Sequence, residues 1–229
     1  PFMITQVLAS NIGGTATLIG DPPNIMIGSA AQLSFLDFVR NLAPIIVVQL
    51  AILMVAFFLL FGKSFKVTAL SKARVMEMDE RKLIKDKALL TKSLTILSLV
   101  IIGFLLHGWL NIEASVIAML GAAALAIWTK VDLEELLVKV EWCTILFFVG
   151  LFVLVGALEH VGFIGKIADV VMAVSKGDMA ITSQVLLWSC GLFSGIIDNI
   201  PLTATFIPVI KQLGTIVGND AIEQLWWSL

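Results

Sequence analysis

The stretch SNIGGTATLIGDPPN, residues 10–24, decides the fold of this chain, because glycine and proline break it between two apolar runs. A lipid bilayer cannot hydrogen-bond a bare backbone. Non-helical backbone at membrane depth is therefore tolerated only where protein buries it or a watery cavity wets it. A second broken stretch, SGIIDNIPLTAT, occupies residues 194–205. Paired broken segments in the two halves of a membrane protein point to the substrate site of a transporter.

The composition indicates a membrane protein. Hydrophobic residues make up 59% of the chain and charged residues 14%, whereas soluble domains carry about 25% charged residues. The net charge is -2, and the basic residues form no phosphate-binding face, so we expect no nucleic-acid partner. Cys143 and Cys190 lie inside apolar runs and are typical of small buried hydrophobes rather than of a disulfide framework.

Five apolar runs without charged residues approach the roughly 20 residues that a helix needs to cross a bilayer. The shortest of them is rich in Ala and Gly, which permit close helix packing. Residues 1–20 and 22–36 are also apolar, and the glycine and proline cluster splits them into two half-helices. The five runs are 43–61, 93–112, 114–128, 142–158 and 179–197. We therefore predict an all-α membrane protein, a polytopic helical bundle.

The basic residues predict the orientation. Nine of the fifteen Lys and Arg residues lie in the loop 63–92, which the positive-inside rule makes cytoplasmic. Following the chain from this loop, run 142–158 crosses outward and run 179–197 enters from outside. The chain turns at 198–201 and returns, which predicts a re-entrant hairpin near 180–212. The first broken stretch lies within a crossing from inside to outside.

The first broken stretch offers ligands for a small ion. Its hydroxyl and amide side chains and its freed carbonyls suit Na⁺ or a small oxyanion, and its glycines permit backbone angles that other residues resist. Asp21 followed by Pro22 predicts a helix N-cap with proline at the first position, and the positive end of that half-helix favours an anion. The alternative is a glycine-rich loop outside the membrane, or a packing kink. The candidate residues are Ser10, Asn11, Gly13, Gly14, Thr15, Thr17, Asp21 and Asn24.

Asp198 carries the second candidate group. An ionisable residue at membrane depth is by default a functional-site hypothesis. Asp198 could bind Na⁺, carry a proton or cap a half-helix, and one carboxylate could do two of these. Asn199 and Thr203 repeat the amide and hydroxyl pattern. Asn11, Asp198 and Asn199 are the possible Na⁺ ligands. We interpret His107, near the outer end of its run, as an interfacial or packed residue rather than a proton relay.

These residues resemble the signature of a known family. Residues 10–24 are similar to the motif of the arsenite permease, sodium/proton antiporter and melanocyte P-protein group, within the ion transporter superfamily that also holds the citrate transporters. Residues 198–203 and 150–160 also resemble segments of this family. The resemblance implies two inverted repeats, each with scaffold helices, a re-entrant hairpin and a broken helix. The resemblance further implies that the tip of the hairpin and the broken helix meet at the substrate site. It also implies an elevator-like transport movement.

The resemblance also implies the organisation of the chain. Residues 1–40 are the broken helix that ends the first repeat, 41–62 a transmembrane helix and 63–92 the cytoplasmic basic loop. Residues 93–229 are the second repeat, with scaffold helices, the hairpin and the truncated start of the next helix. The first hairpin and the second broken helix are absent, so we interpret the chain as an internal fragment of a longer protein.

The functional expectation is a secondary active transporter of a small inorganic or carboxylate anion, of arsenite or citrate type, in the inner (plasma) membrane. One alternative is a sodium/proton antiporter, and another is a non-transporting membrane fragment or scaffold. No nucleophile–base pair, phosphate loop or pair of catalytic carboxylates is visible, so we expect no enzyme. We expect no resident cofactor apart from a coupling Na⁺ or H⁺. The expected partners are the small ion and the lipid bilayer, with a homodimer as a possible assembly.

The predicted orientation can be tested with a cysteine introduced at Ser71, in a background without Cys143 and Cys190. A membrane-impermeant maleimide added outside intact cells should leave this cysteine unlabelled, because the loop 63–92 is cytoplasmic. Efficient labelling from outside would show that the loop is external and that the predicted orientation of every helix is reversed.

Overall fold

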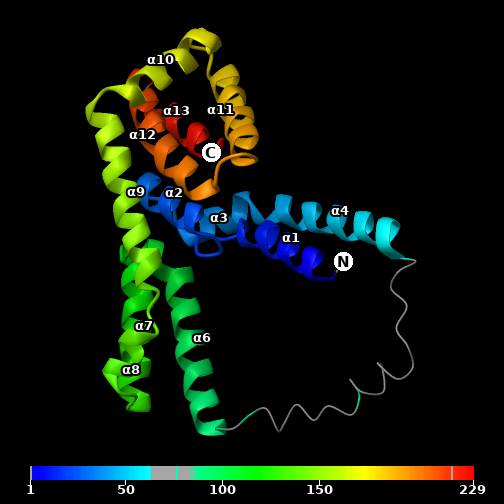
Figure 1. Ribbon diagram of the computed structural model, residues 1–229, viewed down its shortest axis with the longest axis vertical. Coiled ribbons are helices and arrows are strands. Elements are labelled where there is room, and N and C mark those ends of the chain that lie inside the picture. The colour runs from blue at the N-terminus through cyan, green and yellow to red at the C-terminus, as the bar shows by residue number, and fades with distance from the viewer. Residues whose placement is uncertain (1, 63–75, 77–83, 85, 218) are drawn as a thin grey trace. The chain divides into compact units, whose positions relative to one another are not determined.

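The computed structural model describes residues 2–62, 76, 84, 86–217 and 219–229, which form helices and no strand. The chain divides into two compact units, whose helices are labelled in Figure 1. The first unit holds Pro1–Thr17 and Ser34–Val140, and the second holds Leu18–Leu33 and Glu141–Leu229. The first broken stretch therefore contributes its beginning to one unit and its end to the other.

The first unit contains two pairs of packed helices. In Figure 1, α1 runs beside α4 and α6 runs beside α7. The second pair approaches closely because glycine replaces larger side chains at its interface. A Cβ atom at Gly103 would lie 2.7 Å from Ile117 Cγ2, and one at Gly121 would lie 2.2 Å from Val100 Cγ2. The helices of this unit are α1 (Phe2–Gly14), α3 (Phe35–Asn41), α4 (Ala43–Phe61), α6 (Lys87–Leu110), α7 (Ala114–Thr129) and α8 (Leu133–Val138).

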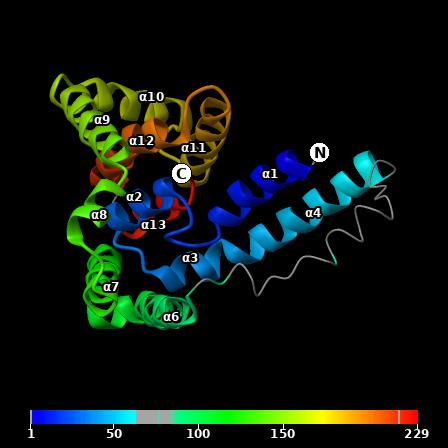
Figure 2. The ribbon, with the colours of Figure 1, turned by 60° about the horizontal axis from the view of Figure 1, so that its bottom comes forward.

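The second unit is built around one helix, α12. It packs against α2, α9, α10, α11 and α13 (Figure 2). Its side chains Val209, Ile210 and Leu213 are fully buried, as is Leu186 of α11. The helices of this unit are α2 (Pro22–Ala31), α9 (Trp142–His160), α10 (Phe163–Ser175), α11 (Met179–Ser194), α12 (Asn199–Val217) and α13 (Asn219–Trp226).

Three of the described helices, α4, α6 and α9, are long and apolar enough to cross a membrane. At most 11% of the residues in their most apolar windows are buried inside the protein. Side chains that are apolar and exposed on this scale suit contact with lipid. The prediction of an all-α membrane protein with several apolar helices is confirmed. The inverted repeats and the re-entrant hairpin stay predictions.

The helix boundaries agree with the apolar runs at some ends and differ at others. Helix α4 covers the run 43–61 residue for residue. Helix α6 begins at Lys87, before the predicted start at residue 93, because the Asp86 side chain caps it by accepting from the Leu89 N–H at 3.0 Å. Residues 87–92 of the predicted loop are therefore helical. The rest of that loop, apart from residues 76, 84 and 86, lies outside the described residues.

The second half-helix was predicted too long. It ends at Ala31, where Gln32 adopts a left-handed φ of 57°. A separate helix, α3, then begins after Ser34, which forms a capping box with Asp37. Serine followed three residues later by a carboxylate was the signal in the sequence for this second start.

The close approach of α6 and α7 generates a stability prediction. We expect Gly121→Ala to lower the melting temperature in detergent, because the new methyl group must displace Val100. Overpacking of this kind costs about 1–3 kcal/mol. The matched control is Gly150→Ala in α9, where an added Cβ meets nothing within 4 Å. Equal melting temperatures for both variants would contradict the predicted interface.

Candidate ion-binding site

The first broken stretch is a short turn between two helices. Helix α1 ends at Gly14, and α2 begins at Pro22. We expected freed carbonyls here, and that was wrong for the end of α1. The carbonyl oxygens of Ile12, Gly13 and Gly14 accept from Thr15 Oγ1 at 2.8 Å, from the Ala16 N–H at 3.2 Å and from the Thr17 N–H at 3.5 Å.

The glycines of this stretch do not use their conformational freedom in the way we expected. Among the described residues, glycine adopts a positive φ at Gly162 and Gly177. Gly13 and Gly14 instead complete the right-handed helix α1, which Ala16 and Thr17 prolong by one turn. A Cβ atom added to Gly13 would meet nothing within 4 Å, so close packing does not require a glycine there either.

Asp21 begins α2, but its carboxylate does not cap that helix. Its backbone is extended, with φ -147° and ψ 144°. Proline occupies the first helical position, as predicted, and the second as well. A capping side chain bonds to the N–H of the second or third helical residue. Pro23 has no N–H, and the Asn24 N–H donates to the backbone oxygen of Asp21 at 3.1 Å. The Asp21 side chain therefore makes no capping bond.

Asp198 begins α12, and its carboxylate does form a cap. Its Oδ1 accepts from the Ile200 N–H at 3.1 Å, and its backbone oxygen accepts from the Leu202 N–H at 3.3 Å. The capping alternative is therefore present in the structure. An ionised carboxylate can accept about four hydrogen bonds, so this cap leaves capacity for an ion. The helix after the predicted turn at 198–201 begins within that turn, at Asn199, because of this cap, and it continues through Pro208 to Val217.

The two helix starts meet within the second unit. Helix α2 packs against α12, and Asn199 Nδ2 lies 3.5 Å from Asp21 Oδ2 as a weak donor. Asp21 and Asp198 lie close enough for their negative charges to repel each other. Asn24 and Thr203, near the starts of α2 and α12, are buried, with 7% and 6% of their surface exposed. We call these five residues the paired-start cluster.

The paired-start cluster holds five of the eleven residues singled out in the sequence. Two of the three possible Na⁺ ligands, Asp198 and Asn199, belong to it. The third, Asn11, lies in α1 of the first unit. The remaining candidates also belong to the first unit, in α1 and the turn that follows it: Ser10, Gly13, Gly14, Thr15 and Thr17.

The electrostatics of the paired-start cluster favour a cation or a proton over an empty site. Each helix N-terminus contributes roughly half a positive elementary charge. Two ionised carboxylates exceed that sum by about one negative charge. A bound Na⁺ or a proton would offset the excess, and oxygen atoms are the ligands that hard cations prefer. Among the described residues, no group of three or more His, Cys, Asp or Glu side chains could hold a metal ion.

Sequence reasoning missed the pairing of Asp21 with Asn199. The signal was present in Pro23, because proline at the second helical position removes the N–H that a capping carboxylate would use. A carboxylate without that partner must find another. The identity of the other partner depends on how α2 packs on α12, and no local pattern encodes that packing.

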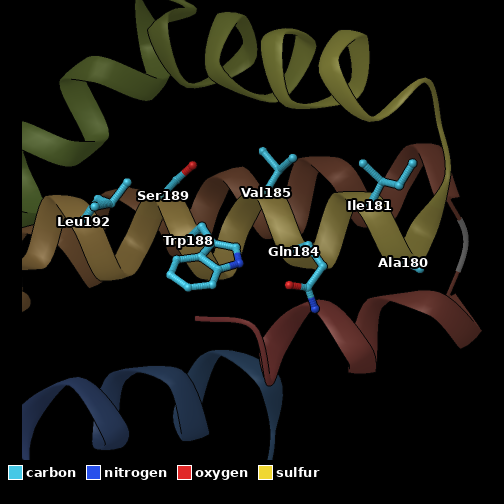
Figure 3. Close-up of a pocket in the computed structure, with 7 residues that line it drawn as sticks. All are labelled: Ala180, Ile181, Gln184, Val185, Trp188, Ser189 and Leu192. Carbon is cyan, nitrogen blue, oxygen red and sulfur yellow. The ribbon is translucent and has the colours of Figure 1, made fainter.

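The face of α11 in Figure 3 forms an open groove of about 500 Å³. Its polar groups are Gln184 and Ser189. Small-molecule sites enclose a ligand and direct several polar groups at it. All the residues that line this groove belong to one helix, so it has a single wall, and we assign it no ligand. They are Ala180, Ile181, Gln184, Val185, Trp188, Ser189 and Leu192.

Comparison with known proteins agrees with a transport role. The family model described as citrate transporter matches residues 1–229. An uncharacterized transporter of Mycobacterium tuberculosis is 41% identical over 229 residues, which are 100% of this chain and 53% of that protein. The 46 kDa membrane protein of Mycobacterium leprae is 39% identical over 230 residues, 100% of this chain and 54% of that protein.

A more distant relative is the human P protein. It is 30% identical over 288 residues, covering 92% of this chain and 34% of the P protein. The chain thus spans about half the length of the mycobacterial relatives and a third of the human one. No solved structure matches it.

Proposed function

Because this chain belongs to the citrate transporter family, we propose that it is part of a secondary active transporter that moves a small carboxylate or inorganic anion together with Na⁺ or H⁺. We further propose that it is multi-pass in the inner (plasma) membrane, with the loop 63–92 in the cytoplasm. The observation that carries the coupling proposal is the paired-start cluster, in which Asn199 links the Asp21 carboxylate to the helix that Asp198 caps.

The order of binding follows from the charges. With both carboxylates ionised, an anion meets net negative charge and is repelled. Once Na⁺ or a proton occupies the space beside Asp21 and Asp198, the positive ends of α2 and α12 face an anion with less opposition. Ion binding therefore precedes anion binding. This order supplies the free-energy link that secondary transport needs, because the anion binds well only to the ion-loaded protein.

A sodium/proton antiporter is the second candidate. The same carboxylate pair favours it, since Na⁺ and H⁺ compete for the same oxygen atoms. In that case the two helix starts serve only to balance the negative charge of the pair. The two candidates differ in one measurable respect, which is whether an anion crosses the membrane with the cation.

Asp198→Asn tests the coupling role in the full-length protein reconstituted in liposomes. Asparagine caps a helix nearly as well as aspartate but lacks the negative charge. We expect at least a tenfold loss of ion-driven citrate or arsenite uptake, and a flattened dependence on Na⁺ and pH. The matched control is Asp178→Asn, because Asp178 also caps a helix with its side chain, accepting from the Ile181 N–H of α11 at 3.0 Å.

If Asp198→Asn keeps the wild-type flux and the same dependence on Na⁺ and pH, Asp198 has no coupling role and serves only as a helix cap. Loss of flux in the Asp178→Asn control as well would assign the defect to helix capping. Flux of Na⁺ against H⁺ without any anion flux would select the antiporter. No flux of any kind in the wild-type protein would favour a non-transporting component.

A further inference from the structure

His107 and Phe35 join two helices of the first unit that are far apart in the sequence. The backbone N–H of Phe35 donates to His107 Nε2 at 2.8 Å. Phe35 is the first residue of α3, and His107 lies in the last turn of α6. The nitrogens at the start of a helix have no partner within it. His107 therefore supplies an acceptor that α3 cannot provide for itself.

The local groups at the start of α3 are already engaged in its capping box. The Ser34 N–H and the Ser34 hydroxyl donate to Asp37 Oδ2, at 2.8 Å and 2.6 Å. The Asp37 N–H donates in turn to Ser34 Oγ at 3.3 Å. Because the capping box takes both side chains, the imidazole is the acceptor left for the Phe35 N–H.

The junction around this bond is tightly packed. The rings of Phe35 and Phe104 stack with their centroids 6.3 Å apart. A Cβ atom added at Gly108 would lie 3.2 Å from Ser34 Cβ. The imidazole is half-buried at this contact. Two rings and a close backbone approach thus hold the start of α3 where the His107 bond can form.

An imidazole nitrogen that accepts a hydrogen bond carries no proton. His107 is therefore neutral in this arrangement, with its proton on Nδ1. Protonation would place a second N–H against the Phe35 N–H, and the positive end of α3 would repel the new charge. Histidine is the side chain whose charge ordinarily changes between pH 5 and pH 8. The bond thus exists only in the uncharged state of its acceptor.

We propose that His107 is a pH-sensitive latch, whose neutral imidazole holds the start of α3 on the end of α6 and whose protonation releases it. This inference goes beyond the transport proposal and does not depend on it. In the predicted orientation the latch lies on the outer side of the membrane, so external acid would open it. The chain released would be α3, which follows α2 after three residues.

The charged groups near the latch do not prevent release. On α3 they are Asp37 and Arg40, and in the turn between α6 and α7 there is Glu113, while α4 and α7 carry no charged residue. Arg40 has the same charge as an imidazolium and could not hold it in place. Asp37 would attract it, but only by giving up Ser34 and opening the capping box. Attraction by Asp37 would thus also loosen the start of α3, because it would break the capping-box bonds that hold it.

The first test reads the tautomer directly. The ¹⁵N-histidine signals of the full-length protein are recorded in lipid nanodiscs, and the His107 signals are identified by their loss in His107→Gln. At pH 8 we expect the ring nitrogen shifts of an unprotonated Nε2 and a protonated Nδ1. A protonated Nε2 at pH 8 would overturn the latch, because that nitrogen could not accept from Phe35.

The second test measures release. Spin labels are attached to Asn41→Cys and Trp109→Cys in a protein that lacks the native cysteines. The distance between them, measured by electron paramagnetic resonance, reports the separation of α3 and α6. We expect one narrow distance distribution at pH 8 and loss of that component at pH 5. His107→Gln keeps an acceptor that does not titrate, so its distribution should stay narrow at both values. His107→Leu should be broad at both.

Two results would overturn the latch in this second test. One is a distribution that does not change between pH 8 and pH 5 with His107 present. The other is a His107→Gln variant that broadens at pH 5 as the parent does, which would assign the response to another group. If His107→Leu does not fold, the comparison of the parent with His107→Gln still tests whether His107 causes the response to pH.

Discussion

Two helices of this protein, α2 and α12, begin beside each other, and the backbone N–H groups at a helix start have no partner within the helix. Helix α12 solves the problem with the Asp198 side chain. Helix α2 solves it with two prolines, which have no N–H to satisfy. That second solution leaves the Asp21 carboxylate without its own helix to cap and turns it toward Asn199. The candidate ion site follows from this difference between two helix starts.

The rest of the second unit supports the meeting of these starts. Helix α12 is surrounded by α2, α9, α10, α11 and α13, and its side chains Val209, Ile210 and Leu213 are fully buried. At the other end of α12, a Cβ at Gly214 would lie 2.3 Å from Ile222 Cδ1, so α13 is also tightly fitted. A rigid α12 matters because an ion site needs its ligands held in place. The apolar, exposed faces of α4, α6 and α9 in turn suit contact with lipid.

Much of this architecture could be predicted from the sequence, for reasons that particular residues make clear. Helix α4 matches its apolar run because lipid-length helices are selected by hydropathy alone. Pro22 marked the helix break that precedes it, and Asp198 marked the start of the helix that follows it. The early start of α6 at Lys87 and the separate helix α3 were misjudged, because both depend on capping side chains that hydropathy does not mark. Asp86 lies before its apolar run, and Ser34 lies inside the apolar stretch 22–36. The Asp21–Asn199 and Phe35–His107 bonds join residues 178 and 72 positions apart, and no local pattern encodes them.

We propose that Asp21 and Asp198 share one ion. This claim is tested most directly by thermal unfolding of four proteins, the wild type, Asp21→Asn, Asp198→Asn and the double variant, with and without Na⁺ and at neutral and acid pH. A shared ion predicts that Na⁺ or acid raises the melting temperature of the wild type. Each single substitution should remove most of that shift, and the double variant should lose no more than either one. Losses that simply add, or a shift that survives both substitutions, would contradict the account.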